Sequence, residues 1–426
     1  MKKVLIITYY WPPAGGPGVQ RWLKFVKYLK DFKVDPVVYI PESPDYPLID
    51  ESFLKEIPGD ITILKKSFFE PYKIASVFSK KQSKRLSSGI IYEKKQSFTE
   101  KVLLWIRGNL FIPDARKYWV KPSVKYLSAY LEKENIDTVI TTGPPHSVHL
   151  IGMKLKERTG VRWISDFRDP WTTIGYHKKL KLNTSSKKKH QNLEKKVLNT
   201  SDLIIVTSKT TKSEFEAKTP QPIHVITNGF DVVKTIEVPL DEKFTISHIG
   251  SLLSGRNPKI LWESLSELIT EHKDFSKDFQ LQLAGTVSKD VLDDVYAYNL
   301  KDHTRLLGYL SHHKALELQR SSQLLSLIEI DSEDTKCIIP GKLFEYLVAK
   351  RPILAIGPEN WDVFDVLRAT NGGTGFSYSE KNALKEKLIS FYNQYKSKKL
   401  TSEAVNLEKY SRKSLTGELA SLIHKE

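Results

Sequence analysis

The sequence has little cysteine, no long hydrophobic run and fewer acidic than basic residues. Its one cysteine, Cys337, excludes an internal disulfide and a zinc cluster built from several thiolates. Such scarcity is typical of proteins in a reducing compartment. No window approaches the roughly 20 apolar residues of a membrane span, and residues 4–7 are too few for a signal-peptide core. We therefore expect a cytoplasmic protein.

The excess of basic residues gives a formal net charge of +16. This charge predicts attraction to an anionic partner, which can be a lipid surface, a phosphorylated ligand or nucleic acid. Basic side chains alternate with aromatic and aliphatic ones over residues 67–116, and residues 178–196 hold eight lysines opposed only by Glu194. Both segments can lie on an anionic bilayer or form the solvated face of their own domain. No zinc-finger or RNP-like motif supports nucleic-acid binding.

The length of 426 residues exceeds one usual hydrophobic core, so we expect two domains. Short apolar runs alternate with helical patterns in both halves, which is typical of α/β domains with parallel sheets. In the N-terminal half strands are expected at residues 4–8, 36–40, 61–64, 138–142, 161–165, 203–207 and 223–227. In the C-terminal half they are expected at 245–249, 279–284, 305–307, 324–330 and 353–356, with a Gly-rich turn at 371–375.

These elements predict an N-terminal domain over residues 1–235, with a basic helical insertion at about 67–120. A C-terminal domain follows over residues 236–400. Residues 401–426 contain a last helix, which we expect to pack back on the N-terminal domain.

The segment 337–352 combines a helix start with charged groups that suit a nucleotide. Gly341 and Lys342 open the helix after a buried strand, where free backbone N–H groups and the lysine favour an anion. Glu345 follows about one turn later and can accept a hydrogen bond from a sugar hydroxyl. The alternative is an ordinary crossover helix with a solvated lysine and glutamate.

Two further loops follow the first strand of each domain. Gly15 and Gly16 allow the backbone to approach a phosphate or a sugar, or they form a rigid strand-to-helix turn. In the second domain Ser251 and Arg256 stand in such a loop, and the arginine can bind a phosphate with two hydrogen bonds. The alternative for Arg256 is a surface arginine without a ligand.

Polar residues also follow two strands of the N-terminal domain. His146 stands at a helix start, at the strand end where α/β sheets bind ligands. Asp166, Arg168, Asp169 and Trp171 come directly after the strand at 161–165. Grouping these charges is costly without a ligand or an internal ion pair, so the alternative is an Asp–Arg pair that locks the loop.

The ordered set of motifs resembles the family 4 retaining glycosyltransferases of the GT-B fold. The motifs are Gly15-Gly16, Asn228-Gly229-Phe230-Asp231, Gly250-Ser251 with Arg256, and Pro340-x-Lys342-x-x-Glu345-Tyr346. The resemblance implies an α/β protein with two Rossmann-like domains facing a cleft and a nucleotide-sugar donor held mainly by the second domain. Two departures concern the donor site: Cys337 replaces the first of two usual glutamates, and Ser251 replaces the usual arginine after Gly250.

The resemblance also implies residue roles. Glu345 holds the donor ribose, and Arg256, Lys342 and the helix start at Gly341 stabilise the diphosphate. The glycine pair makes room near the phosphate, and His146 lies beside the transferred sugar. No metal ion and no cofactor are expected, because arginine, lysine and helix dipoles stabilise the leaving diphosphate.

The expected function is retaining, hexosyl-type transfer from a nucleoside-diphosphate sugar to a hydroxyl of a lipid-linked or saccharide acceptor, in bacterial cell-surface polysaccharide synthesis. Asp169 or Asp166 would position the acceptor hydroxyl, with Arg168 and Trp171 on the acceptor side. The basic N-terminal face would hold the enzyme on an anionic membrane, as a peripheral protein of the inner face of the plasma membrane. The alternatives are a nucleotide-sugar epimerase of the same fold and, from another class, a basic nucleic-acid-binding protein.

Overall fold

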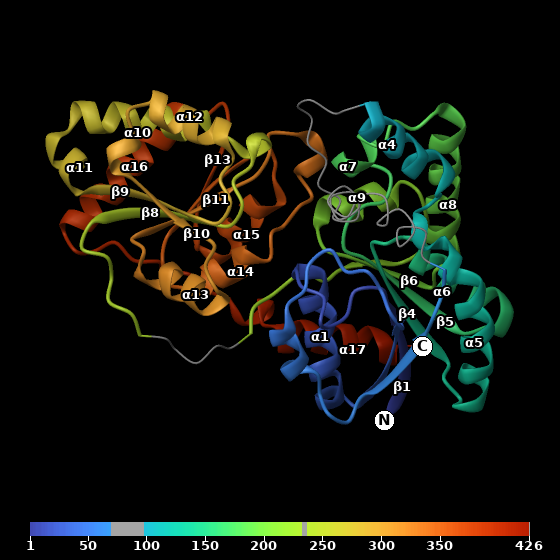
Figure 1. The fold of residues 1–426 in the computed structure, drawn as a ribbon. Coiled ribbons are helices and arrows are strands. Elements are labelled where there is room, and N and C mark those ends of the chain that lie inside the picture. The colour runs from blue at the N-terminus through green and yellow to red at the C-terminus, as the bar shows by residue number, and fades with distance from the viewer. Residues whose placement is uncertain (70–97, 232–236, 426) are drawn as a thin grey trace. The chain divides into compact units, whose positions relative to one another are not determined.

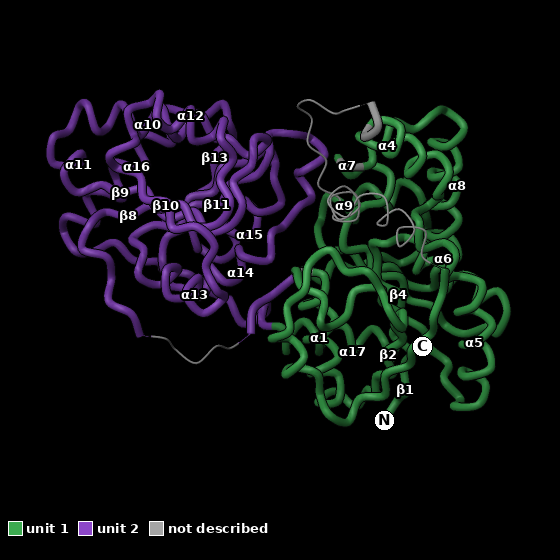
Figure 2. Tube along the Cα trace, in the orientation of Figure 1, with its two compact units in different colours: residues 1–227, 412–426 green, residues 228–411 purple. Residues whose placement is uncertain are grey.

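The computed structural model describes residues 1–69, 98–231 and 237–425 (Figure 1). The chain forms two compact units, the first made of Met1–Thr227 with Arg412–Glu426 and the second of Asn228–Ser411 (Figure 2). The boundaries therefore fall a few residues before the expected 235/236 and about ten residues after the expected 400/401. Of the basic insertion expected at about 67–120, residues 70–97 lie outside the described residues.

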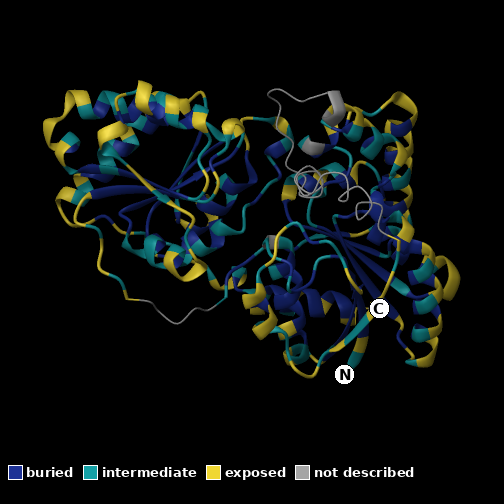
Figure 3. Cartoon of the chain, viewed as in Figure 1, coloured by how far each residue is buried: buried dark blue, intermediate teal, exposed yellow. Residues whose placement is uncertain are grey.

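The first unit contains a parallel seven-stranded sheet in the order β3-β2-β1-β4-β5-β6-β7. Its strands are β1 Lys2–Thr8, β2 Val34–Pro41, β3 Thr62–Lys66, β4 Thr138–Gly143, β5 Arg162–Phe167, β6 Leu203–Val206 and β7 Ile223–Val225. The central strands are buried along most of their length, because helices cover both faces of a parallel sheet (Figure 3). The strands β1, β4 and β5 are neighbours, so the loops that follow them emerge at one edge of the sheet.

Helices follow the strands of the first unit. They are α1 Pro17–Leu29, α4 Phe98–Leu110, α5 Val120–Lys133, α6 Ser147–Thr159, α7 Gly175–Lys178, α8 Thr184–Thr200 and α9 Lys209–Glu216, with short 3-10 turns at η1 Lys30–Phe32, η2 Glu51–Glu56 and η3 Ala115–Trp119. Gly160 takes the left-handed conformation that ends α6, and the Asn183 side chain caps the start of α8.

The last helix, α17 (Arg412–His424), packs on the first unit, as the sequence predicted. Leu415, Leu419 and Ile423 are buried in the core of that unit. The Arg162 guanidinium donates to the carbonyl oxygens of Leu422 and Ile423, both at 2.9 Å, so it satisfies acceptors that the helix end leaves open.

The second unit contains a parallel six-stranded sheet in the order β10-β9-β8-β11-β12-β13. Its strands are β8 Phe244–Ile249, β9 Phe279–Ala284, β10 Thr304–Gly308, β11 Leu324–Ile328, β12 Ile353–Gly357 and β13 Gly373–Ser377. Its helices are α10 Lys259–Glu271, α11 Lys273–Asp278, α12 Lys289–Ala297, α13 His312–Ser321, α14 Lys342–Val348, α15 Asp362–Thr370 and α16 Lys381–Lys396, with η4 Ser254–Arg256, η5 Lys301–His303, η6 Glu333–Thr335 and η7 Glu408–Tyr410.

Side chains of β11 and β12 alternate between two apolar clusters. Leu324 and Ile328 join the cluster that contains α10 and α16, whereas Leu325 and Leu327 join the cluster that contains α14 and α15. Successive strand residues point to opposite faces, so each face of this sheet is covered by its own core.

The α/β class with two parallel, Rossmann-like sheets is confirmed, and each strand expected from the sequence is present. One strand was not expected: β13 occupies most of the Gly-rich segment that was predicted as a turn, and that prediction is wrong. Among the helices that the structure describes, none has the length and hydropathy needed to cross a membrane.

Candidate functional site

In the second unit the loop after β8 surrounds the side chain of Lys342. Gly250 has a φ of +133°, and a Cβ atom there would lie 3.2 Å from the Lys342 Nζ atom. The ammonium group donates to the Ile249 carbonyl oxygen at 3.2 Å. Ser251, the next residue of this loop, is exposed. The loop and the start of α14 therefore come together in the folded protein.

Lys342 is the first residue of α14 and has few neutralising partners. Burial lowers its pKa to about 8, and the nearby charge of Arg256 adds to this effect, while Glu329 and Glu345 oppose it. An anion that binds beside Lys342 favours the protonated, charged form of its side chain. The site therefore favours an anionic ligand.

Arg256 lies in the same region but is not free. Its Nε and Nη2 atoms donate to the two carboxylate oxygens of Glu329 at 3.0 and 3.1 Å. Glu329 directly follows β11 and is buried, whereas the arginine side chain is 34% exposed. The remaining Nη1 atom of Arg256 makes no hydrogen bond to a described residue. One edge of the guanidinium is thus held by the protein, and the other can meet a phosphate.

Glu329 was not among the site residues predicted from the sequence. The sequence contains a feature that could have identified it, because Glu329 is a carboxylate between Ile328 and Ile330 in a run predicted as a buried strand. A charge in that position needs a partner, and in the folded protein the partner is Arg256.

Glu345 lies one turn into α14 and is partly buried. Its Oε2 atom accepts a hydrogen bond from the Gln319 side chain of α13 at 3.1 Å. Its charge acts on both Lys342 and Arg320, so these groups are near one another. At Gly341 an added Cβ atom would meet nothing within 4 Å, and the backbone there is helical. The space beside the helix start is therefore open.

In the first unit His146 stands directly before α6 and is 4% exposed. Its ring stacks on Trp171, with centroids 4.7 Å apart and planes 3° from parallel. Neither ring nitrogen makes a hydrogen bond within the part of the chain that the structure describes. Burial holds the His146 pKa well below its usual value, and three neighbouring histidines contribute, so the imidazole is neutral at pH 7.

Trp171 is fully buried and donates its indole N–H to His190 at 3.3 Å. Its ring packs against one face of the His146 ring, and no part of it is exposed to contact an acceptor in this structure. The prediction that placed Trp171 on the acceptor side is thus replaced by a packing role.

Asp166 is also fully buried, and its carboxylate has several donors. Arg21 binds it at 2.9 and 3.4 Å, Trp22 at 2.7 Å and Thr142 at 2.8 Å. Although burial opposes ionisation, Arg21 and these hydrogen bonds hold the Asp166 pKa below its usual value. Asp166 therefore belongs to the internal ion pair that the sequence left open as an alternative. Its partner is Arg21, which the sequence analysis did not select, and not Arg168.

Arg168 instead binds backbone carbonyl groups. Its Nε donates to the Gly143 oxygen at 3.2 Å and its Nη2 to the Pro144 oxygen. Its Nη1 lies against Gly18, where an added Cβ atom would be only 1.6 Å away, so a larger residue there would require the Arg168 side chain to move. Asp169, the next residue, is half-buried and makes no hydrogen bond to a described residue. Burial raises its pKa even though Arg168 lies near.

The glycine pair after β1 is explained by its own backbone. Gly15 donates to the Leu48 carbonyl oxygen at 2.9 Å, and a Cβ atom there would be 2.9 Å from the Leu48 side chain. Gly16 precedes α1 with a φ of +103° and provides no side-chain cap. A rigid turn accounts for both glycines, and a contact with phosphate stays a prediction.

The structure thus brings Lys342, Arg256 and Glu345 close together in the second unit, and His146, Arg168 and Asp169 on neighbouring loops in the first. In the part of the chain that the structure describes, no group of three His, Cys, Asp or Glu side chains is arranged to hold a metal ion.

Comparison with known proteins identifies the fold. Residues 90–234 match the sequence model of the family described as Glycosyltransferase Family 4. No curated protein matches the chain in sequence. The resemblance to family 4 glycosyltransferases predicted from the motifs is confirmed by this match and by the solved structures that share the fold.

Three of these structures cover nearly the whole chain. TarM from S. aureus has a TM-score of 0.61 and 14% identity over 100% of this chain and 99% of its own. The lipopolysaccharide outer core galactosyltransferase WaaB has a TM-score of 0.59 and 14% identity, with 99% of each chain covered. Sucrose-phosphate synthase from Thermosynechococcus elongatus has a TM-score of 0.59 and 13% identity over 99% of this chain and 97% of its own. At these identities the likeness shows the GT-B fold.

Proposed function

We propose that this GT-B protein, whose residues 90–234 match Glycosyltransferase Family 4, is a retaining glycosyltransferase. It moves a hexosyl group from a nucleoside-diphosphate sugar to a hydroxyl of a lipid-linked or saccharide acceptor in cell-surface polysaccharide synthesis. The observation that carries the proposal is the grouping of Lys342, Arg256 and Glu345 in the second unit. The crystal structure of a TarM mutant in complex with UDP supports a nucleoside diphosphate as the donor's leaving group.

The two cations account for stabilisation of the leaving diphosphate. When the bond to the sugar breaks, negative charge grows on the diphosphate, and groups already positioned there lower the barrier. Lys342 is partly buried beside the Gly250–Ser251 loop, and Arg256 is oriented by Glu329. We therefore propose a reaction that needs neither a metal ion nor a cofactor. Glu345, oriented by Gln319, accepts the ribose hydroxyls.

The first unit supplies the groups for the sugar and the acceptor. Neutral His146 has two unbonded ring nitrogens, so it can donate to or accept from a sugar hydroxyl. Asp169 is the carboxylate after β5 that remains available, and it positions the acceptor hydroxyl. Asp166 has no such role, because Arg21, Trp22 and Thr142 already bind its oxygens.

A surface of the first unit supports a membrane-bound acceptor. Val102 and Trp105 on α4 are exposed, and Asn109 of this helix bonds to the backbone of Lys181 and Asn183. The helix is thus fixed next to the lysine-rich segment, whose exposed members are Lys178, Lys181, Lys187, Lys188, Lys189, Lys195 and Lys196. Exposed apolar side chains beside a cationic patch suit an anionic bilayer. We propose peripheral binding to such a membrane and no nucleic-acid partner.

Calorimetric titration of the purified chain with UDP and UDP-sugars tests the donor site. We expect Lys342→Met and Glu345→Gln each to weaken nucleotide binding by about tenfold or more, since hydrogen bonds to charged groups contribute about 1.5–3 kcal/mol. Lys350→Met is the matched control, because Lys350 is exposed and lies just beyond α14. If Lys342→Met and Glu345→Gln both bound UDP with wild-type affinity, the assignment of these residues to the donor site would be wrong. Isomerised donor formed without acceptor would instead support an epimerase.

A further inference from the structure

One carboxylate in the lysine-rich helix α8 does not face solvent. Glu194, the only acidic residue among residues 178–196, is 2% exposed. Its Oε1 accepts from the Thr172 backbone N–H at 3.0 Å and its Oε2 from the Thr172 hydroxyl at 2.8 Å. The same carboxylate pairs with the Lys218 ammonium at 2.9 Å. Because all of these interactions satisfy the buried carboxylate, they fix the position of the segment that contains Thr172.

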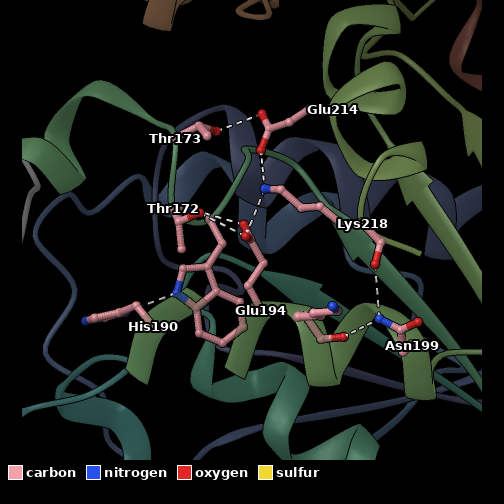
Figure 4. Close-up of polar contacts among 9 residues, drawn as sticks. Thr172, Thr173, His190, Glu194, Asn199, Glu214 and Lys218 are labelled. Carbon is pink, nitrogen blue, oxygen red and sulfur yellow. Dashed lines mark hydrogen bonds and ion pairs between the residues drawn. The ribbon is translucent and has the colours of Figure 1, made fainter. Parts of the chain in front are cut away.

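The contact extends through a second carboxylate (Figure 4). Lys218 also pairs with Glu214 at 2.5 Å, and Glu214 accepts from the Thr173 hydroxyl at 2.7 Å. Thr172 and Thr173 are therefore both fixed by side chains from α8 and from the end of α9. We call Glu194, Glu214 and Lys218 the clamp.

The segment held by the clamp is the loop that carries Asp169. One turn before Glu194 on α8, His190 accepts from the Trp171 indole, so one helix fixes two successive residues of the loop. Trp171 in turn stacks on His146. On the other side of the loop, Thr207 donates to the Arg168 carbonyl oxygen at 2.9 Å. Asp169 lies between these attachments, and its carboxylate makes no hydrogen bond to a described residue.

We propose that Glu194 is a positioning residue for sugar transfer, which acts by fixing the loop 168–173 so that Asp169 and the His146–Trp171 stack hold the acceptor hydroxyl and the sugar in register. This inference rests on the proposed function. It assigns Glu194 no contact with either substrate. The acceptor step depends on the clamp, and nucleotide binding does not, since the donor groups belong to the second unit.

The expected loss of kcat depends on how far the loop shifts when the clamp is weakened. A shift of a reacting group by about 1 Å can lower a rate by about a hundredfold. Glu194→Gln keeps the shape of the side chain but offers one acceptor oxygen in place of two and leaves Lys218 with Glu214 alone. Thr172→Val removes one hydroxyl while keeping the backbone contact. We expect a loss of kcat of about 10- to 100-fold for the first variant and a smaller loss for the second.

Glu157→Gln is the matched control. Glu157 pairs with Lys196 of the same helix at 2.9 Å, but both side chains are about half exposed. It carries the same chemical change and breaks an ion pair of α8 that does not contact the loop. Transfer by this control should match that of the wild type.

The experiment measures sugar transfer, UDP affinity and hydrogen–deuterium exchange of peptides spanning residues 168–173 in all four proteins. We expect Glu194→Gln to lower kcat, to leave the UDP Kd unchanged, to increase exchange in the loop and to shift the acid limb of the pH profile, because Asp169 gains solvent. Unchanged exchange and kcat in this variant would overturn the proposal, and so would an equal change in the Glu157 control. Wild-type protein without transfer, but with faster loop exchange in Glu194→Gln alone, would refute the proposed function and retain the clamp.

Discussion

Asp166 and Asp169 are three residues apart and meet opposite environments. The Asp166 carboxylate accepts hydrogen bonds from Arg21, Trp22 and Thr142, whereas Asp169 makes none to a described residue. In consequence the pKa of Asp166 is lowered although its burial opposes this, and burial raises the pKa of the half-buried Asp169. The first aspartate is bound within the fold, and the second keeps its carboxylate without a hydrogen bond to the described residues, as the proposed role of Asp169 requires.

Replacement of Asp166 by alanine should destabilise the protein strongly. The change leaves the Arg21 guanidinium buried without its partner, which typically costs about 3–5 kcal/mol. Urea unfolding followed by circular dichroism measures the difference. Asp169→Asn serves as the comparison and should keep nearly wild-type stability while transfer falls. Equal stability of Asp166→Ala and the wild type would contradict the role given to the Arg21 pair.

Nucleotide affinity should depend on pH through Lys342. Its pKa of about 8 in the free protein means that the side chain is charged below that pH and loses its proton above it. A diphosphate binds the charged form better, so affinity should fall as pH rises from about 7 to 9. Calorimetry with UDP over that range measures the effect, and Lys342→Met should flatten the profile. A profile that is already flat in the wild type would argue against contact between Lys342 and the diphosphate.

At the scale of elements, α6, α7, α8 and the adjoining loops gather four buried histidines. His146 stacks on Trp171, His149 lies 4.2 Å from the Phe167 ring, and the rings of His177 and His190 meet edge to face at 4.5 Å. The pKa of each is lowered, mainly by burial. Arg168 and Asp166 face His149, and Lys187 faces His177.

This group predicts a loss of stability in mild acid. A histidine with a folded pKa below its unfolded value of about 6.5 binds protons more tightly when unfolded, so stability is full above pH 6.5 and falls below it. With pKa values of about 4 for His177 and about 3 for His149, the decline should run from pH 6.5 to about 4 for the first histidine and to about 3 for the second. Each contributes on the order of 3 kcal/mol at the acid end.

Urea midpoints measured from pH 7.5 to 4.5 check this expectation. His177→Gln should reduce the slope of midpoint against pH, since it removes one titrating group. His272→Gln is a control, because His272 is exposed. A midpoint that stays constant between pH 7 and 5 would show that these histidines are not buried in the neutral form.

At the scale of the whole molecule, the two units have separate cores, and α17 belongs to the first. Removal of residues 412–426 should therefore destabilise unit 1, because it exposes the surface of α1 and η1 that α17 covers. Unit 2 should keep the proposed nucleotide site. Hydrogen–deuterium exchange should rise in unit 1 alone, and UDP affinity should stay within about twofold of the wild type. A loss of UDP binding would contradict this division.

Strands were predicted well because an apolar run of strand length between turn residues has few other uses in an α/β protein. The segment 371–375 was predicted wrongly, since its glycines are required by packing and not by a turn. A Cβ atom at Gly373 would lie 2.2 Å from the Ile353 carbonyl oxygen, and one at Gly375 would lie 2.1 Å from the Phe364 ring. No local pattern reports such a contact between distant residues.

The sequence by itself determined the fold class and the loops that carry the site, because periodicity and loop chemistry are local properties. It placed Arg256 in the loop after the strand at 245–249 and Lys342 at the helix start after the strand at 324–330, and the structure shows that these strands, β8 and β11, are paired. Only the tertiary structure decided which charged side chains are bound by partners within the protein. Asp166 is bound by Arg21 from 145 residues away, Arg256 by Glu329 from 73 and Thr172 by Glu194 from 22. Whether a charged side chain serves the fold or a ligand depends on the partners that folding brings to it, and those partners are distant in the chain.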